Sequence, residues 1–173
     1  MNKQLIGWIM AAALASPAMA ALPVGAQAPD FVATGAAKGK PVQLHLAQQL
    51  RKGPVVLYFF PKANTEGCDL EAHAYSEAIR QFKKSGASVI GMSADDSATL
   101  KVFSVKKCSG AFPVATASPA TQKAYDVAWA AHPGLTTRTS YVINRRGRIV
   151  MVHDDPDWSK HVSLTLAAVK SLR

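Results

Sequence analysis

The sequence predicts an α/β fold in which helices cover both faces of a mixed central sheet. Two continuous apolar runs, at residues 54–60 and 87–92, have the composition of strands that are buried on both faces. Segments with a helical spacing of apolar residues alternate with these runs. A hairpin signal near the C-terminus adds two antiparallel strands. This alternation of strands and helices favours a three-layer domain with the sheet in the middle.

The first half of the chain is expected to supply three strands and one long helix. The strands are expected at residues 30–33, 41–46 and 54–60, with a Gly/Lys-rich turn at 35–40 and a loop or single helical turn at 48–53. Pro61 ends the third strand because proline has no N–H to donate to a sheet. A helix is expected at residues 68–84 and ends before Gly86. Its expected apolar face comprises Leu70, Ala72, Ala74, Tyr75, Ala78, Ile79 and Phe82.

The second half is expected to supply four strands and three helices. The strands are expected at residues 87–92, 112–115, 139–144 and 148–153, and a turn at 145–147 joins the last two. The helices are expected at residues 98–107, from 118 to about 127, and at 159–172. Asp95, Asp96 and Ser97 are residue types that begin helices. Pro119 would occupy a first-turn position, where proline is tolerated.

The first twenty residues have the pattern of a secretory signal peptide. Lys3 gives a short positive start, an apolar run follows at residues 5–14, and Ala18-Met-Ala20 places alanines where a signal peptidase cleaves. We expect cleavage after Ala20, which leaves residues 21–173 as a single domain of an exported, periplasmic protein. The alternative is an uncleaved anchor, although the run is shorter than the about 20 residues that span a bilayer. No later stretch is apolar for long enough to insert stably in a membrane.

The formal net charge of +9 is spread along the chain. The paired basic residues at 83–84, 106–107 and 145–146 are scattered rather than gathered in one cluster. Together with export, this argues against nucleic acid as a partner. A weak attraction to anionic surfaces or acidic proteins stays open.

The chain contains two cysteines, Cys68 and Cys108. Outside the cytoplasm, a structural disulfide is one explanation for such a pair. There is no C-x-x-C pair, which argues against a thioredoxin-type disulfide oxidoreductase. The histidines show no metal-ligand spacing and there is no glycine-rich phosphate loop, so we expect neither a metal nor a nucleotide or other cofactor.

Cys68 follows a buried strand and lies at the start of a predicted helix. The first N–H groups of a helix lack internal partners and the helix dipole is positive there, so both favour a thiolate. Thr65 can hydrogen-bond to that sulfur or to a bound substrate, and Pro61 can shield it from water. Each residue alone also has a structural interpretation: Cys68 as a small buried side chain, Thr65 as a helix cap and Pro61 as the end of a strand.

Taken together, these residues have the spacing P-x-x-x-T-x-x-C directly after a strand, which resembles the active-site motif of the peroxiredoxins. The run L-Y-F-F-P-K-A-N-T-E-G-C-D-L-E-A at residues 57–72 is similar to the Q-type, or bacterioferritin-comigratory, branch of this AhpC/TSA superfamily. G-A-Q-A-P-D-F at 25–31 and R-T-S-Y-V-I-N at 138–144 are also similar to family motifs. The resemblance covers residues 25 to about 152 and implies a thioredoxin-like fold.

The resemblance implies a thiol-dependent peroxidase that reduces hydrogen peroxide and organic hydroperoxides. Cys68 would attack the peroxide and become a sulfenate, which must then be reduced. Thr65 would orient the peroxide and Pro61 would screen the site. Arg138 would hold Cys68 as a thiolate and stabilise the transition state, with Glu71 behind it as a supporting residue. The alternative interpretation of Arg138 is a surface strand residue paired with a carboxylate.

One departure from the family pattern concerns the second cysteine. Many Q-type members carry it five residues after the first, where this chain has His73. Other members place the resolving cysteine on the next helix, where Cys108 lies. The resemblance therefore implies a Cys68–Cys108 disulfide as the oxidised state. Because such a bond needs Cα atoms within about 7 Å, the first turn around Cys68 is expected to unwind.

Two alternatives stay open from the sequence. The protein could be a one-cysteine peroxidase in which Cys108 is inert, or a non-catalytic thioredoxin-like binding module with a structural Cys68–Cys108 disulfide. The peroxidase interpretation requires a thioredoxin-like or other thiol reductant, which would itself be exported. By resemblance to this branch, a monomer is favoured.

Overall fold

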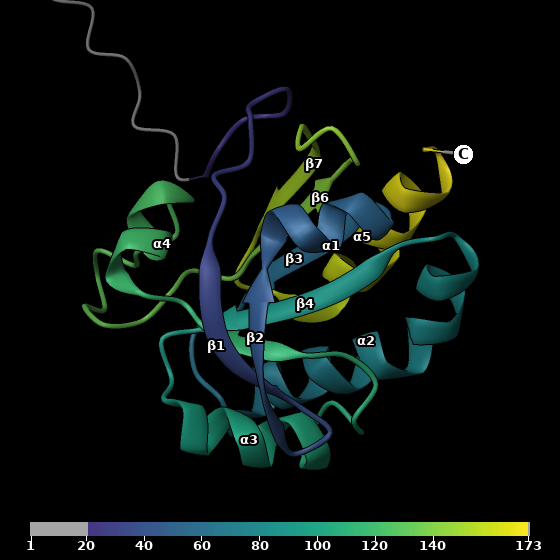
Figure 1. The fold of residues 1–173 in the computed structure, drawn as a ribbon. Helices are drawn as coiled ribbons and strands as arrows, with labels where there is room; N and C mark the ends of the chain where they lie inside the picture. The colour runs from purple at the N-terminus through teal and green to yellow at the C-terminus, as the bar shows by residue number, and fades with distance from the viewer. Residues whose placement is uncertain (1–20, 173) are drawn as a thin grey trace, which may run out of the picture.

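A seven-stranded mixed sheet runs through the middle of the computed structural model, which describes residues 21–172 (Figure 1). Across the sheet, the strands are β2 (Lys40–His45), β1 (Val32–Ala37), β5 (Val114–Thr116), β4 (Ser88–Ser93), β3 (Val55–Phe59), β6 (Thr139–Ile143) and β7 (Ile149–Asp154). The β3/β4 and β4/β5 pairs are parallel, whereas the other pairs are antiparallel. The predicted mixed α/β fold is therefore confirmed.

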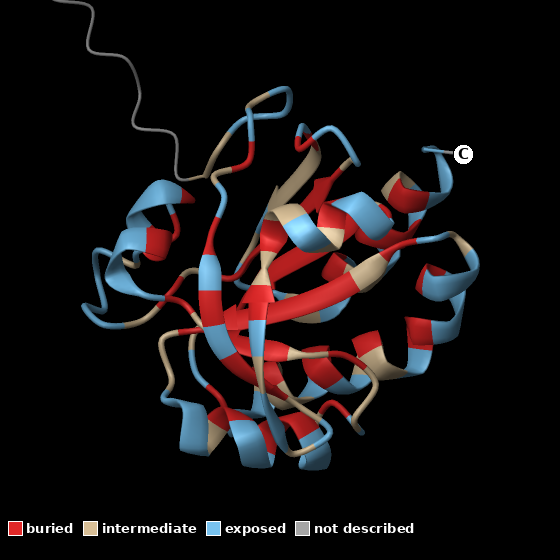
Figure 2. Cartoon of the chain, viewed as in Figure 1, coloured by how far each residue is buried: buried red, intermediate tan, exposed pale blue. Residues whose placement is uncertain are grey.

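Helices pack on both faces of this sheet. The helices are α1 (Leu46–Lys52), α2 (Glu66–Lys84), α3 (Ser97–Lys106), α4 (Pro119–Ala124) and α5 (His161–Lys170), with a 3-10 turn (Trp158–Lys160) before the last. Strand β3 shows how the layers are built: Val56 and Tyr58 face the core shared with α2, α3 and α5, whereas Val55 and Leu57 face the core shared with α1. Figure 2 shows buried residues along the central strands and on the inner sides of the helices.

The first strand is longer than the sequence predicted, and the second has the predicted length but begins one residue earlier. The turn expected at residues 35–40 shrinks to two residues, because β1 continues to Ala37 and β2 begins at Lys40. Lys38 and Gly39 have φ of 52° and 72°, the left-handed conformations that two-residue hairpin turns require. The sequence did not indicate this turn because its first residue, Lys38, is not one of the glycine, asparagine or aspartate residues that usually adopt such a conformation. The segment expected as a loop or single turn at 48–53 is the helix α1.

The buried face of α2 also differs from the prediction. Leu70 was expected in the core but is 42% exposed. The buried stripe follows Cys68, Glu71, Tyr75 and Phe82, whose spacing places Leu70 on a different side of the helix. Glu71, a charged residue outside the expected apolar face, therefore occupies a core position.

The register of the strands brings several loops to one end of the sheet. Phe59 pairs with Thr139 in antiparallel β3/β6, so the chain leaving β3 lies beside the chain entering β6. Strand β4 is parallel to β3 and ends at Ser93 on the same side. Thr139 also pairs with Asp154, which places the end of β7 there. Pro61, Cys68 and Arg138 thus come from segments that meet at this end.

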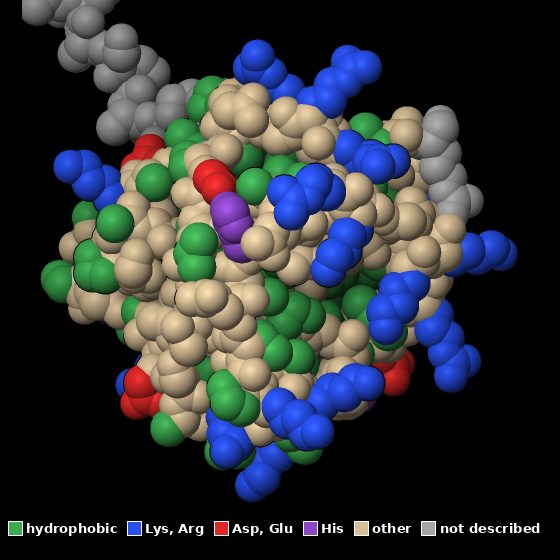
Figure 3. All heavy atoms as spheres, viewed as in Figure 1, with side chains coloured by type: hydrophobic (Ala, Val, Ile, Leu, Met, Phe, Trp, Pro, Cys, Tyr) green, Lys and Arg blue, Asp and Glu red, His purple; other side chains and the backbone are tan. Residues whose placement is uncertain are grey.

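The surface carries its positive charge in a dispersed form. Lysine and arginine side chains stand around most of the face shown in Figure 3 rather than in one cluster. Within residues 21–172, no helix is both long and apolar enough to span a membrane. The expected signal peptide, residues 1–20, lies outside the described residues.

Candidate active site

Cys68 is the third residue of α2 and is 1% exposed. It therefore lies in the first helical turn, where backbone N–H groups lack helical partners. Thr65 is the residue that precedes the helix, but its side chain does not cap it. Instead, the Thr65 hydroxyl donates a hydrogen bond of 2.9 Å to the carbonyl of Lys62. Thr65 itself is exposed.

The loop before Cys68 is held by a residue that sequence reasoning assigned elsewhere. The N–H of buried Ala63 donates to Oδ2 of Asp95 at 2.7 Å, and the Ser93 hydroxyl donates to the same oxygen at 2.8 Å. Asp95 was expected only to begin a helix, but Asp96 is the residue whose side chain caps α3. Asp95 thus joins the loop after β4 to the loop after β3.

Arg138 is buried and reaches the sulfur of Cys68. Its Nη2 donates to Cys68 Sγ at 3.5 Å, its Nε donates to the carbonyl of Pro156 at 2.9 Å, and its Nη1 pairs with Glu71. Burial acts to lower the pKa of Arg138, but the negative charges of Glu71 and Cys68 outweigh it and raise the pKa above its usual value. The guanidinium is therefore positive, and Arg138 is not the exposed surface residue of the alternative interpretation.

Gly67 leaves room for the Arg138 guanidinium beside Cys68. A Cβ added at this residue would lie 3.2 Å from Nη2 of Arg138 and 3.6 Å from the ring of Trp158. A contact of 3.2 Å is tight, so any larger side chain would press on the guanidinium. The glycine directly before Cys68 therefore protects the position of Arg138.

Glu71 lies behind Arg138 and is completely buried. Burial raises its pKa from 4.5 to about 7, although the charge and hydrogen bond of Arg138 act in the opposite direction. Within residues 21–172, its Oε1 accepts no hydrogen bond, and it faces Nδ1 of His161 at 3.6 Å. Oε2 of Glu71 accepts from Nη1 of Arg138, which is the contact that the supporting role predicted for Glu71 requires.

His161, at the start of α5, is a buried residue that sequence reasoning did not connect with the site. Its Nε2 lies 2.9 Å from the carbonyl of Asp155 and must donate to it, so a neutral ring accepts at Nδ1 from the Ser140 hydroxyl at 2.8 Å. Burial lowers the pKa of His161 to about 4. The neutral ring therefore ties the segment that carries Pro156, the acceptor for Arg138, to strand β6.

Cys108 is fully buried just after the end of α3. Burial, reinforced by the negative charge of Asp69, raises the pKa of the Cys108 thiol well above its usual range. Asp69 in turn pairs with Lys107 at 2.6 Å. Both cysteines are free thiols in this structure. His73, which occupies the alternative resolving position, is exposed and lies 3.6 Å from Glu77.

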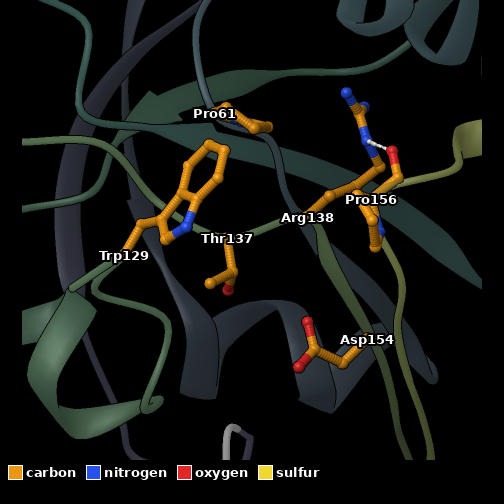
Figure 4. A pocket seen from close by; sticks show the side chains of 6 residues that line it. All are labelled: Pro61, Trp129, Thr137, Arg138, Asp154 and Pro156. Carbon is orange, nitrogen blue, oxygen red and sulfur yellow. Dashed lines mark hydrogen bonds between the residues drawn. The ribbon is translucent and has the colours of Figure 1, made fainter. Parts of the chain in front are cut away.

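A cavity of about 360 Å³ adjoins the site and is lined in part by Pro61 and Arg138. Figure 4 shows these residues with Trp129 and Pro156 around it. In the part of the chain that the structure describes, no group of three or more His, Cys, Asp or Glu side chains could hold a metal ion. The site therefore combines a nearly buried sulfur, a positive guanidinium and helical N–H groups, which is an arrangement suited to attack by a thiolate on a polarised bond.

Comparisons with known proteins agree with this arrangement. The model of the AhpC/TSA family matches residues 24–152. Chloroplastic Peroxiredoxin Q of Arabidopsis thaliana is 32% identical over 148 residues, which cover 85% of this chain and 67% of the relative. The crystal structure of Peroxidoxin BcpB from Mycobacterium tuberculosis has a TM-score of 0.78 at 25% identity, covering 87% of this chain and 97% of that one. Peroxiredoxin Q of Xanthomonas campestris has a TM-score of 0.69 at 26% identity, covering 80% and 89%.

Proposed function

The chain belongs to the AhpC/TSA family, and within it to the Q-type peroxiredoxins, which makes it a thiol-dependent peroxidase; we propose that Cys68 is the residue that attacks the peroxide. The observation that carries this proposal is the hydrogen bond from Arg138 to Cys68 Sγ. A cysteine used only for packing or for a structural disulfide needs no buried guanidinium against its sulfur. Cys108, by contrast, has a carboxylate as its charged neighbour.

The reaction assigns a role to each residue around the sulfur. The thiolate of Cys68 attacks one peroxide oxygen, so an S–O bond forms, the O–O bond breaks, and the leaving oxygen takes a proton and departs as water or an alcohol. Arg138 and the first N–H groups of α2 would stabilise the negative charge as it moves onto the oxygens. Thr65 would orient the peroxide by turning its hydroxyl away from the Lys62 carbonyl. Pro61 would screen the reacting atoms from water.

We further propose that Cys108 resolves the sulfenate. Its thiol would attack the sulfur of Cys68, which forms a disulfide and releases water. Two features support a preceding local opening: both thiols are buried, and the raised pKa of Cys108 keeps it protonated while the fold is closed. The segment after Cys108 already departs from helical geometry, because Ser109 and Gly110 have φ of 49° and 63°. If opening is rare, Cys108 is inert and an external thiol reduces Cys68 directly.

The cellular setting forms the remaining part of the proposal. The signal-peptide pattern of residues 1–20 supports export to the periplasm, with residues 21–173 as a single mature domain. The electrons would then come from an exported thioredoxin-like protein or another thiol. We propose that the protein acts as a monomer.

Counting thiols after peroxide addition tests these roles. One equivalent of hydrogen peroxide should consume both thiols of the reduced protein, and peptide mass mapping should find a Cys68–Cys108 disulfide. Cys68→Ser should leave Cys108 reduced, whereas Cys108→Ser should accumulate a sulfenate that dimedone traps. If Cys68 reacts no faster than free cysteine at the same pH, its assignment is wrong. If Cys108→Ser leaves the lifetime of the sulfenate unchanged, the resolving role of Cys108 is wrong while that of Cys68 stands.

A further inference from the structure

The Arg138 guanidinium is held by a turn that follows β7. Its Nε donates to the carbonyl of Pro156 at 2.9 Å, the hydrogen bond marked by the dashed line in Figure 4. Pro156 is exposed and has no N–H of its own, so the residue before it must fix the turn. The N–H of Asp155 donates to the carbonyl of Arg138 at 3.2 Å, and the Asp155 carbonyl accepts from His161. The position of Pro156 therefore depends on two contacts of Asp155.

Only one neutral form of the His161 ring holds this turn. Nε2 lies 2.9 Å from the Asp155 carbonyl, which accepts hydrogen bonds and never donates them. Nδ1 lies 2.8 Å from the Ser140 hydroxyl, which donates to it when Nε2 carries the proton. A proton on Nδ1 alone would turn the lone pair of Nε2 against the oxygen of Asp155. The neutral ring must therefore carry its proton on Nε2.

A chain of buried hydroxyl groups supports this form of the ring. The Thr165 hydroxyl donates to the backbone carbonyl of His161 at 2.7 Å, so Tyr75 is the donor in any contact between these two hydroxyls. The shorter contact of the Tyr75 hydroxyl is with Ser140, at 3.2 Å. When Tyr75 donates there, the proton of Ser140 is left for Nδ1 of His161. Every hydroxyl proton in the chain then has an acceptor.

Glu71 connects the same ring with the other side of Arg138. Its Oε2 accepts from Nη1 of Arg138, and its Oε1 lies 3.6 Å from Nδ1 of His161. Within residues 21–172, Oε1 has no hydrogen bond of its own. A proton on Nδ1 would attract this oxygen and compete with the guanidinium for the carboxylate. The ring with its proton on Nε2 leaves Glu71 to Arg138.

We propose that His161 is a positioning residue for the peroxidase reaction, which acts through the turn at residues 155–156 to keep the Arg138 guanidinium against Cys68. The inference rests on the role proposed for Cys68 as the nucleophile. The Nε2–H of His161 fixes the Asp155 carbonyl, and the Pro156 carbonyl that follows fixes Nε of Arg138. Because the guanidinium is planar, fixing Nε also sets the place of Nη2, which lies 3.5 Å from Cys68 Sγ.

Two replacements of His161 separate its hydrogen-bond donor from its bulk. The amide nitrogen of glutamine lies as many bonds from Cα as Nε2 of histidine, whereas that of asparagine matches Nδ1 and stops short of Asp155. His161→Asn should slow oxidation of Cys68 by hydrogen peroxide about tenfold, which is less than the loss of a whole donor because Glu71 still holds the guanidinium. His161→Gln should restore most of the rate.

Val169→Ala is the matched control, because it also removes buried volume from α5 and should leave the oxidation rate unchanged. Oxidation is measured in a single turnover by rapid quenching and mass spectrometry, and circular dichroism checks that each variant is folded.

A second readout follows the turn and the ring directly. NMR of protein with isotope-labelled arginine measures how fast the Nε–H of Arg138 exchanges with water. The exchange should be several-fold faster in His161→Asn than in the wild type, and unchanged in Val169→Ala. In wild-type protein with isotope-labelled histidine, the nitrogen chemical shifts of His161 at neutral pH should show a proton on Nε2 and none on Nδ1. A proton on Nδ1 alone would overturn the proposal without any variant.

The remaining outcomes are equally decisive. If folded His161→Asn oxidises at the wild-type rate, or folded His161→Gln is as slow as His161→Asn, the donor of His161 does not position Arg138. Equal slowing by Val169→Ala would reduce the effect to a general loss of stability and overturn the proposal. Should His161→Asn fail to fold, a tenfold loss in folded His161→Gln would overturn it. In each case the role of Cys68 stands, whereas wild-type oxidation no faster than that of free cysteine would show that the proposed nucleophile itself is wrong.

Discussion

Replacement of Arg138 by lysine keeps a positive charge near Cys68 but removes the planar guanidinium and its several N–H donors. The guanidinium reaches three acceptors at once: Cys68 Sγ, the Glu71 carboxylate and the Pro156 carbonyl. A lysine ammonium is a compact charge that cannot span all three. Because Glu71 is fully buried, it should attract the ammonium and leave the sulfur without its donor.

The size of the effect follows from the removal of one hydrogen-bond donor at the reacting sulfur. Loss of one preorganised donor from a developing anion lowers rates by about 100- to 1,000-fold. The Arg138–Cys68 contact is long, at 3.5 Å, so we expect the lower end of this range. Arg138→Lys should therefore slow oxidation of Cys68 by hydrogen peroxide about 100-fold, equivalent to about 2.7 kcal/mol at 1.36 kcal/mol per tenfold.

The assay is stopped-flow competition for hydrogen peroxide against a peroxidase of known rate. Arg148→Lys is the matched control, because the Arg148 guanidinium is exposed and donates to the carbonyl of Gly25 at 3.1 Å. Thermal unfolding followed by circular dichroism checks that each variant is folded at the assay temperature. A rate for Arg138→Lys within threefold of the wild type would show that charge alone suffices, and would refute the need for a guanidinium that reaches all three acceptors.

Two further predictions concern residues behind the site. Asp95→Ala should lower the free energy of unfolding by about 1 to 3 kcal/mol in urea titrations, because the buried N–H of Ala63 loses its acceptor. Asp95→Asn keeps an oxygen that can accept this hydrogen bond and should lose less. Equal losses in the two variants would contradict this role of Asp95. Folding raises the pKa of Glu71 from 4.5 to about 7, so its protonated form contributes stability that is lost as the pH rises through that interval. The free energy of unfolding of Glu71→Gln minus that of the wild type should therefore rise between pH 4.5 and 7, by at most about 1.4 kcal/mol per pH unit. A difference that does not change with pH would argue against the raised pKa of Glu71.

The sequence was informative wherever a local pattern determines structure. The apolar run of β3 and the helical spacing of α2 predicted both elements to within two residues at each end. The spacing from Pro61 to Cys68 pointed to the chemistry. What could not be predicted depends on contacts between distant segments. Asp95 looks like a helix-starting residue until the strand order places it beside Ala63. His161 is separated from Ser140 by a hairpin strand and a turn, and nothing in its local sequence signals a buried neutral ring.

The same long-range packing gives the two cysteines different charged neighbours. Cys68 faces a guanidinium, whereas burial, reinforced by the negative charge of Asp69, raises the pKa of the Cys108 thiol. With Cys68 as the proposed nucleophile, a peroxide that enters the closed fold would therefore meet one reactive sulfur and one protonated thiol.

Asp69 also directly follows Cys68 in the first turn of α2, so any unwinding of that turn moves both residues together. Unwinding would carry the Cys68 sulfenate out of its pocket and would at the same time withdraw the negative charge that, in addition to burial, raises the pKa of Cys108. If the same opening also uncovers Cys108, the loss of burial and of the Asp69 charge would both lower the pKa of its thiol. The proposed resolving role of Cys108 would then begin only after Cys68 has been oxidised.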